Sequence, residues 1–322
     1  MMKKLTTFGG QLKNQLLHLG THGKHIAKEL NQAGHFVICL DKENTDCKYY
    51  HRKVIQDLSK EPRELVPILR SGVDTVFHLA GRIEISESYD QLIQFWEDNV
   101  NGTIQLIKFM KVFGVKNIVY SSSAGVYKAK DRPLKETDDI AFNNPYANTK
   151  IAAESLIRDS GLNHVIFRFF NLAGADPDGE MGECHEPETH LIPVIFNKIN
   201  NFVINGDTYN TSDGTCVRDY VHVTDIAKAH LSARDYLNKG GKSDTFNLGF
   251  GAGYSIKEII ELIRDYCRLD IRYEIGKKRK GDPSNLVADI SKASDILNFR
   301  PNYDIVEIIR TAYDWHKKNV KR

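Results

Sequence analysis

Four short runs of apolar and β-branched residues, each the length of a buried strand, recur through the first half of this chain. They are HFVICLD (35–41), DTVFHLA (74–80), KNIVYSS (116–122) and HVIFRFF (164–170). Segments with apolar residues at helical spacing separate or follow them, at 64–70, 91–114 and 146–159. Strands that are buried on both faces read as continuous apolar runs, so this alternation predicts an α/β fold with a doubly wound parallel sheet.

The character of the chain changes after residue 171. Loops rich in Gly, Pro and Asp follow, and then shorter helical patterns at 255–267 and 304–319. A chain of 322 residues can bury a large core or two lobes. We expect a Rossmann-like nucleotide-binding domain from residues 1–175 with a returning segment at about 217–249. Residues 176–216 and 250–322 are expected to form a smaller α/β lobe that binds the substrate beside it.

The overall charge argues against two classes of partner. The formal net charge is +2 with 27% charged residues, so we expect neither nucleic acid nor a membrane surface as a partner. No apolar run approaches a membrane span, and the N-terminal lysines are not followed by the apolar stretch of a signal peptide. Five scattered cysteines without a Cys-x-x-Cys pair fit a reduced, cytoplasmic setting.

A pair of glycines points to a dinucleotide. Gly20 and Gly23 precede a helical pattern, as in turns that place a pyrophosphate at a helix N-terminus. Asp41 closes a predicted strand 18 residues after Gly23, where a carboxylate accepts hydrogen bonds from the adenosine ribose and repels a 2′-phosphate. This spacing predicts NAD rather than NADP. Asp57 and Leu58, after the next apolar stretch, are expected to frame the adenine.

Leu17 stands where a third glycine of this turn is expected. Two positions for the first strand are open. If residues 14–19 (NQLLHL) form it, Leu17 occupies a place where glycine makes the tight turn at no steric cost. If residues 3–10 (KKLTTFGG) form it, the chain between strand and helix is too long for a normal phosphate cradle.

Tyr146 and Lys150 lie four residues apart, directly after Pro145, and therefore on one face of a predicted helix. A tyrosine with a pKa near 10 becomes a base at neutral pH only if that pKa falls by roughly three units, about 4 kcal/mol. The Lys150 ammonium and the positive nicotinamide ring of NAD are candidates to supply this. Ser123 ends the preceding strand, where its hydroxyl can bind the reacting oxygen. We therefore predict these three as the catalytic residues.

These motifs resemble the extended short-chain dehydrogenase/reductases, and among them the UDP-hexose 4-epimerase family, from about residue 20 to 318. The segments that carry the resemblance are HLAG (78–81), DNVNGT (98–103), SSSAGVY (121–127), PYANTK (145–150), FRFFNLAGADPDGEMGE (167–183), ETHLIP (188–193), DGTCVRDYVHVTDIA (213–227) and GDPSNLVADISKA (281–293).

The resemblance implies inversion at C4 of a UDP-hexose through a 4-keto intermediate. Tyr146 would remove the 4-hydroxyl proton, C4 would pass hydride to NAD, and the hydride would return to the opposite face of the sugar. Lys150 would bind the nicotinamide ribose, and Ser123 would hold the reacting oxygen. The remaining cofactor contacts that it implies are Ala80, Gly81, Asn99, Ser121 and Phe170.

The resemblance also implies a set of UDP-sugar contacts. They are Ser123, Asn171, His190, Leu191, Arg218, Arg279, Asp282 and Leu286. Arg218 and Arg279 would clamp the diphosphate, which suits the forked donors of arginine, and Asp282 would accept from the uridine ribose. Leu286 stands where relatives use a bulky tyrosine to exclude N-acetyl sugars, so we predict some turnover of UDP-N-acetylglucosamine.

Three positions depart from the family's common pattern. Leu17 fills the glycine position, Phe169 replaces a tyrosine, and Ile83 replaces a cofactor-contacting lysine for which Arg82 is the candidate substitute. An alternative function is therefore a catalytically impaired sugar-nucleotide binder. A dehydratase or decarboxylase is disfavoured, because no acid follows Ser123.

Two further features bear on metals and partners. ECHEPETH gathers Cys184, His185, Glu186 and His190, which are zinc-ligand types, but their spacing matches no common structural site. We expect a substrate loop there and no metal. The 91–114 helix and the Tyr146 helix carry enough apolar surface for a symmetric homodimer through a four-helix bundle, which the resemblance also implies.

Overall fold

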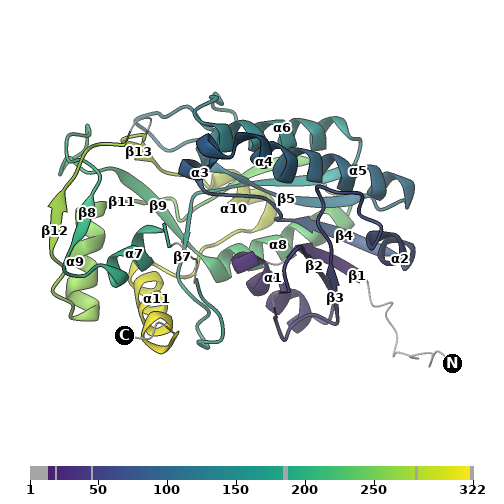
Figure 1. The fold of residues 1–322 in the computed structure, drawn as a ribbon, viewed down its shortest axis with the longest axis horizontal. Coiled ribbons are helices and arrows are strands. Elements are labelled where there is room, and N and C mark those ends of the chain that lie inside the picture. Colours follow the sequence, from purple (N-terminus) through teal and green to yellow (C-terminus); the bar gives the residue numbers. More distant parts are fainter. Residues whose placement is uncertain (1–13, 19, 45, 184–187, 280–281, 320–322) are drawn as a thin grey trace.

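A seven-stranded parallel sheet forms the centre of the larger part of the molecule (Figure 1). The computed structural model describes residues 14–18, 20–44, 46–183, 188–279 and 282–319. The strand order is β10-β6-β5-β4-β1-β2-β3. The strands are β1 (Asn14–His18), β2 (Phe36–Asp41), β3 (Arg52–Ile55), β4 (Val73–His78), β5 (Asn117–Ser123), β6 (Asn163–Phe169) and β10 (Asp244–Leu248). This confirms the predicted fold class.

The first strand is β1, which agrees with the first of the two predicted positions; residues 3–10 lie outside the described ranges. Leu17 is fully buried inside this strand, in register with Cys39 of β2 and Phe77 of β4. Helix α1 (Gly20–Gln32) begins two residues after β1 ends, so residue 19 alone connects them. Position 17 is thus a core strand position, and its side chain belongs to the same cluster as Ile26 and Ala27 of α1.

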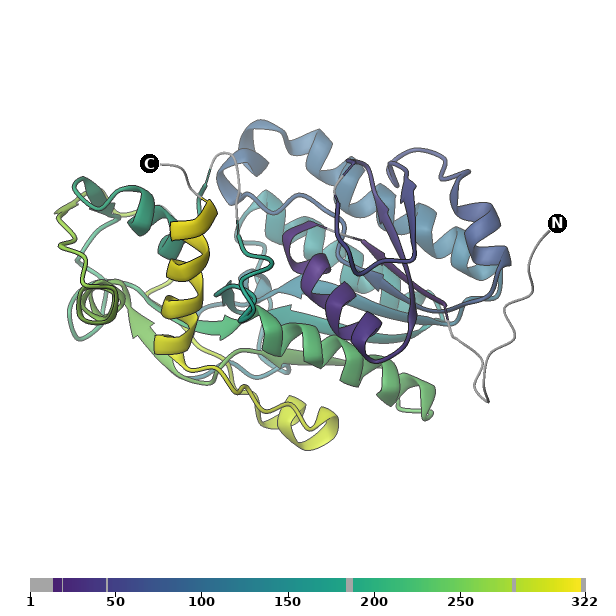
Figure 2. The same ribbon diagram turned by 90° about the horizontal axis from the view of Figure 1, so that it is seen from below.

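Helices cover both faces of the sheet. Figure 2 shows α1 and α8 (Val223–Asn238) side by side on one face, where they enclose one apolar core. On the other face lie α2 (Leu65–Arg70), α5 (Gly102–Val112) and α6 (Pro145–Asp159). The predicted 91–114 helix consists of α4 (Leu92–Trp96), a π-helical turn η1 (Glu97–Asn101) and α5; α3 (Ile85–Asp90) precedes it.

The smaller lobe is built around β9 (Val217–His222). This strand pairs with β7 (Asn171–Ala173), β11 (Gly253–Ser255) and β13 (Asn285–Leu286). A two-stranded pair, β8 (Phe202–Ile204) with β12 (Tyr273–Ile275), lies beyond it. Helices α7 (Leu191–Asn197), α9 (Ile256–Cys267) and α11 (Ile305–Asn319) enclose the core of this lobe.

The chain crosses between the two parts more than once. After β9, which belongs to the smaller sheet, α8 and β10 return to the large sheet, and α10 (Ser291–Leu297) packs against both. The division by residue number into two domains stays a prediction. Within the described ranges, no helix is both long and apolar enough to cross a membrane. Cys39, Cys47, Cys216 and Cys267 carry free thiols.

Candidate active site

Most of the predicted site residues meet where the parallel strands end. Asp41 is the last residue of β2, Ala80 and Gly81 follow β4, and Ser121 and Ser123 are at the C-terminal end of β5. Five further predicted residues stand after strands or at the start of helices: Gly20 and Gly23 in α1, Asp57 and Leu58 after β3, and Phe170 after β6. In open α/β sheets this edge is where ligands bind.

The predicted catalytic pair, Tyr146 and Lys150, lies on α6. Asn144 caps this helix by accepting a hydrogen bond from the Ala147 N–H, and Pro145 occupies its first turn, as the sequence favours. The Lys150 ammonium donates to the Ser121 carbonyl at 2.9 Å and lies 5.9 Å from the centre of the Tyr146 ring. Both side chains are buried, at 3% and 8% exposure. Ser123 completes the predicted trio, and its hydroxyl is near enough to Tyr146 to oppose the rise in the pKa of the phenol.

Burial controls the acid–base state of this pair. It raises the pKa of Tyr146 to about 12, although the Ser123 hydrogen bond opposes the change. It lowers the pKa of Lys150 to about 8, opposed by the charge of Glu154. The expected lowering of the Tyr146 pKa by Lys150 is therefore not found in the protein alone. Burial and the charge of Glu84 raise the pKa of the phenol, and positive charge beside it is needed to make Tyr146 a base.

Gly81 and Asn99 form a tight cradle beside this pair. Gly81 has φ +148°, and a Cβ there would lie 2.7 Å from Asn99 Oδ1, so a larger residue would displace that amide. Asn99, in η1, accepts from the Arg82 N–H at 2.7 Å and donates to Thr149 Oγ1 at 2.9 Å. The π-helical turn thereby connects the loop after β4 to α6.

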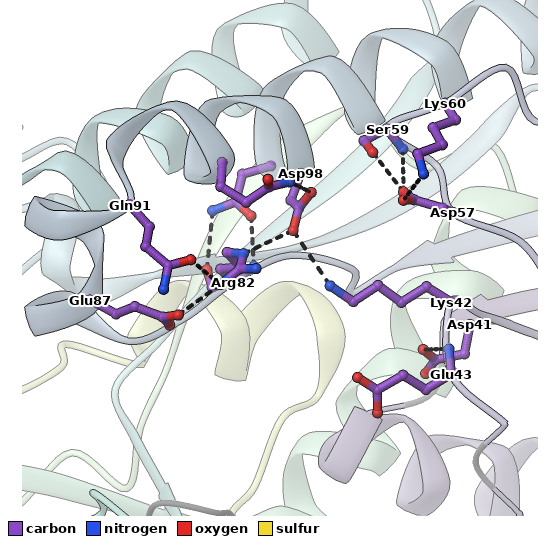
Figure 3. Close-up of polar contacts among 12 residues, drawn as sticks. Asp41, Lys42, Glu43, Asp57, Ser59, Lys60, Arg82, Glu87, Gln91 and Asp98 are labelled. Carbon is purple, nitrogen blue, oxygen red and sulfur yellow. Dashed lines mark hydrogen bonds and ion pairs between the residues drawn. The ribbon is translucent and has the colours of Figure 1, made fainter.

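Charged side chains meet around Arg82, the residue that follows Gly81 (Figure 3). The Arg82 guanidinium donates to Asp98 at 2.9 Å and to Glu87 at 2.8 Å, and Lys42 lies 3.5 Å from Asp98 (Figure 3). Arg82 is thus engaged by two acids. Its predicted substitution for the lysine absent at position 83 stays a prediction.

Asp57 is also held in place. Its Oδ1 accepts from the Ser59 N–H at 2.9 Å and from the Ser59 hydroxyl at 2.7 Å (Figure 3). Burial would raise the pKa of Asp57, but these bonds and nearby Lys60 outweigh it and leave the pKa below its usual value. The carboxylate is therefore ionised at neutral pH, as a hydrogen-bond acceptor for a ribose or an adenine amine needs to be.

These residues fit a dinucleotide. The carboxylates ending β2 and following β3 and the buried Lys150 ammonium match the hydroxyls and amine that NAD presents. The departure from the family's glycine pattern is Leu17, which is buried in β1.

The predicted substrate residues gather in the smaller lobe. Arg218 Nη2 donates to Asp282 Oδ1 at 2.8 Å, and Leu286 stands opposite Arg218 in the β9–β13 register. Leu286 also packs against the cluster that contains Ala124, the neighbour of Ser123. Asn171 begins β7, Leu191 begins α7 directly after His190, and Arg279 is exposed.

Sequence reasoning missed Tyr209. It is buried, and the charges of Asp282, Arg218 and Arg279 all act on its pKa, which burial raises. The phenol therefore lies among three predicted substrate residues. A signal was available in the sequence, because Tyr209 lies just before DGTCVRDY and thus close to Arg218, the predicted diphosphate contact.

Sequence reasoning also missed Lys28. This buried lysine of α1 donates to Asp176 at 2.8 Å and to Asp178 at 2.6 Å, and lies 3.6 Å from Glu180. Burial alone would lower the pKa of Lys28, but the two aspartates raise it above its usual value. The three acids lie in the segment after β7, about 150 residues from Lys28 in the sequence. No local pattern therefore predicts the contact.

The suspected metal-ligand cluster is only partly described. Cys184, His185 and Glu186 lie outside the described ranges. The ligand atoms of Glu183, Glu188 and His190 all lie within 4.8 Å of one another. The hydrogen bond between His190 and Glu183 explains why these side chains lie close together. The expectation of no metal stays a prediction.

Comparisons with known proteins agree with this geometry. Residues 18–249 match the model of the NAD dependent epimerase/dehydratase family. UDP-glucose 4-epimerase of Halalkalibacterium halodurans is 39% identical over 319 residues, which are 93% of this chain and 94% of the relative. The crystal structure of UDP-glucose 4-epimerase from Brucella ovis in complex with NAD superposes with a TM-score of 0.89 at 35% identity, covering 94% of this chain and 98% of that one.

A third relative bears on the sugar. The UDP-Glc/GlcNAc 4-epimerase of Campylobacter jejuni has a TM-score of 0.81 and 32% identity, with 95% of this chain and 99% of that chain covered. The sequence motifs, the fold, the strand-end cradle and these similarities lead to one assignment. The chain belongs to the NAD-dependent epimerase/dehydratase family and, within it, to the UDP-glucose 4-epimerases.

Proposed function

We propose that this chain interconverts UDP-glucose and UDP-galactose by inverting C4, and that Tyr146, Lys150 and Ser123 carry the chemistry. The observation that supports it best is the placement of Tyr146 and Lys150 on successive turns of α6, against the strand that ends in Ser123. NAD is the cofactor of this family. It supplies a hydride acceptor and, once reduced, a donor, and its oxidised nicotinamide ring brings positive charge.

The residues proposed to hold NAD lie along the edge where the strands end. Gly20 and Gly23 present the N-terminus of α1 to the pyrophosphate, and Asp41 accepts from the adenosine ribose. Asp57 and Leu58 frame the adenine. The rest of the proposed contacts are Ala80, Gly81, Asn99, Ser121, Lys150 and Phe170.

The roles in proton transfer follow from burial and charge. Tyr146 takes the proton of the sugar 4-hydroxyl and gives one back at the end of the cycle. In the protein alone its pKa is about 12, so the phenolate forms only when positive charge is added beside it. Lys150, held on the Ser121 carbonyl, provides part of that charge. Ser123 donates to the reacting oxygen and keeps it near the phenol.

The UDP moiety is proposed to supply the affinity, since the sugar itself must be free to turn over. Arg218 and Arg279 bind the diphosphate, and Asp282 accepts from the uridine ribose. The remaining proposed contacts are Asn171, His190 and Leu191. Leu286 borders the sugar, and because leucine is smaller than tyrosine we include UDP-N-acetylglucosamine among the substrates.

We further infer a homodimer in the cytoplasm. Apolar side chains of α3, α4 and α5 are exposed in the single chain: Ile93 is 69% exposed, Tyr89 60% and Val112 76%. Leu92 and Trp96 are exposed as well, and a second copy would cover these apolar side chains. The proposed interface is a four-helix bundle of the α4–α5 helix and α6 with their copies.

The first experiment is conversion of UDP-galactose to UDP-glucose by the purified protein, without and then with added NAD. Turnover in either case, lost in Tyr146→Phe, supports the proposal. Folded protein that binds UDP-sugar but gives no turnover with saturating NAD contradicts it and supports the alternative, an impaired sugar-nucleotide binder whose cofactor cradle is damaged at the short β1–α1 connection.

A further inference from the structure

Helix α6 and strand β5 meet along a row of contacts made by three successive turns of the helix. Tyr146, Lys150 and Glu154 are spaced four residues apart, so their side chains leave the same face of α6. All three are buried, with 8%, 3% and 1% exposure. Glu154 has no part in the proposed mechanism, although it continues the row of the two residues that do.

Each member of this row faces one of three consecutive serines of β5. The Ser123 hydroxyl lies near the phenol of the first, and the Ser121 carbonyl accepts from the ammonium of the second at 2.9 Å. Ser122 lies between these two serines, and its hydroxyl donates to Glu154 Oε1 at 2.5 Å. The contact of Glu154 therefore fixes the middle of the strand segment that carries both catalytic contacts.

Glu154 is itself held from the other side. Arg168 of β6, which is 4% exposed, donates from Nε to Oε1 at 3.0 Å and from Nη2 to Oε2 at 2.7 Å. Arg158 donates to Oε2 at 2.7 Å. Burial would raise the pKa of Glu154, but Arg168, Ser122 and Arg158 outweigh it and leave the pKa below its usual value. The carboxylate is thus charged at neutral pH, and its position is fixed by four hydrogen bonds.

We propose that Glu154 is a positioning residue for the catalytic pair: through Ser122 it fixes β5 against α6, and its charge stabilises the ammonium form of Lys150. This inference rests on the proposed function, because it assumes that Tyr146 and Lys150 carry the chemistry. The side chains facing the ammonium are the Tyr120 ring of β5, at 5.1 Å, and the Tyr146 ring. Both are neutral phenols, so Glu154 is the charged group that acts on it.

Two substitutions separate the two parts of this role. Ser122→Ala removes the link to the strand and keeps every charge, so we expect kcat for UDP-galactose to fall about tenfold, with KM within about twofold and the pH profile unshifted. Glu154→Gln also removes the charge beside Lys150. In the profile of kcat against pH, the fall on the alkaline side is expected to move to lower pH by about half a unit or more in this variant. The reason is that Lys150 loses its proton more easily without the carboxylate.

Arg158→Gln is the matched control. Arg158 donates to Glu154 Oε2, and its side chain is 38% exposed. Its loss therefore leaves both the hydrogen bond from Ser122 to Oε1 and the charge of Glu154 in place. We expect kcat and the pH profile of this variant to match the wild type. If the pH profile of Arg158→Gln shifts as much as that of Glu154→Gln, then any change of charge in this region has the same effect. That result would overturn the specific role proposed for Glu154.

The outcomes are distinguishable from failure of the proposed function. Wild-type kcat in Ser122→Ala, or an unshifted alkaline limb in folded Glu154→Gln, overturns the positioning role while Tyr146→Phe remains inactive. Turnover retained in Tyr146→Phe would instead overturn the proposed function itself. If Glu154→Gln does not fold, because Arg168 is left buried without its partner, Ser122→Ala alone decides, since it leaves that ion pair intact.

Discussion

Restoring the glycine of the nucleotide-binding pattern should harm this protein. Leu17 is fully buried in β1 and packs in the core that α1 and α8 cover. Leu17→Gly therefore removes a core side chain instead of repairing a turn. Truncating a buried leucine to alanine costs about 2–5 kcal/mol, and glycine in a strand interior costs about 0.5–1 kcal/mol more. We expect the free energy of unfolding to fall by about 3–6 kcal/mol.

The assay is urea unfolding followed by circular dichroism, together with thermal melting. A loss of that size lowers Tm by at least about 6 °C for a chain of this length, taking about 2 °C per kcal/mol. Leu17→Met is the control, because a swap that nearly conserves volume costs less than about 1.5 kcal/mol. NAD that copurifies with each variant is released by acid and measured by its absorbance.

We expect Leu17→Gly to carry no more NAD per folded protein than the wild type, since residue 17 does not line the connection to α1. A glycine variant that is as stable as the wild type and holds more NAD would refute this reasoning. It would place residue 17 in the phosphate turn and require β1 to lie earlier in the chain.

Three more perturbations test other parts of the molecule. Leu286→Tyr should reduce turnover of UDP-N-acetylglucosamine by at least about tenfold while UDP-galactose turnover stays within about threefold; equal losses on both sugars in a coupled assay would contradict the position given to Leu286. Ile93→Asp should convert a dimer to a monomer in size-exclusion chromatography. Ile296→Asp, which changes an exposed isoleucine of α10, should leave the elution volume unchanged. His230 is buried neutral, and burial lowers its pKa to about 4. The pKa of His230 in the folded protein lies below its unfolded value of about 6.5. Its contribution to the free energy of unfolding is therefore complete above pH 6.5 and is lost as the pH falls from 6.5 toward 4. Urea midpoints across this range should be less pH-dependent in His230→Gln than in the wild type, and parallel curves would contradict the assignment.

The sheet and the placement of Tyr146 and Lys150 on one helix were predictable because their signals are local. Continuous apolar runs at strand length mark β2, β4, β5 and β6, and the Tyr146–Lys150 spacing needs only the geometry of one helix. The helix predicted at 91–114 was also found, but its π-helical turn was not foreseen. That turn puts Asn99 against Thr149, a contact across 50 residues that no periodicity encodes.

The first strand and the charges of the site needed the structure. From the sequence, Leu17 is a missing glycine; in the fold it is a core residue, because β1 extends through His18 and leaves one residue before α1. The pKa of Tyr146 depends on how completely the phenol is buried, which its spacing from Lys150 does not reveal. The acids that hold Lys28 lie about 150 residues away, beyond any pattern of one helix.

We expect the Lys28 contact to link the binding of NAD to that of the UDP-sugar. Lys28 lies on α1, whose N-terminus is proposed to face the pyrophosphate, and Asp176 lies shortly after Asn171, a proposed UDP contact. If one ligand orders its side of this buried ion pair, less conformational entropy remains to be lost when the other ligand binds. Cofactor bound first is then expected to raise the affinity for the nucleotide sugar, and the sugar to raise retention of the cofactor by the same factor, since coupling free energy is reciprocal.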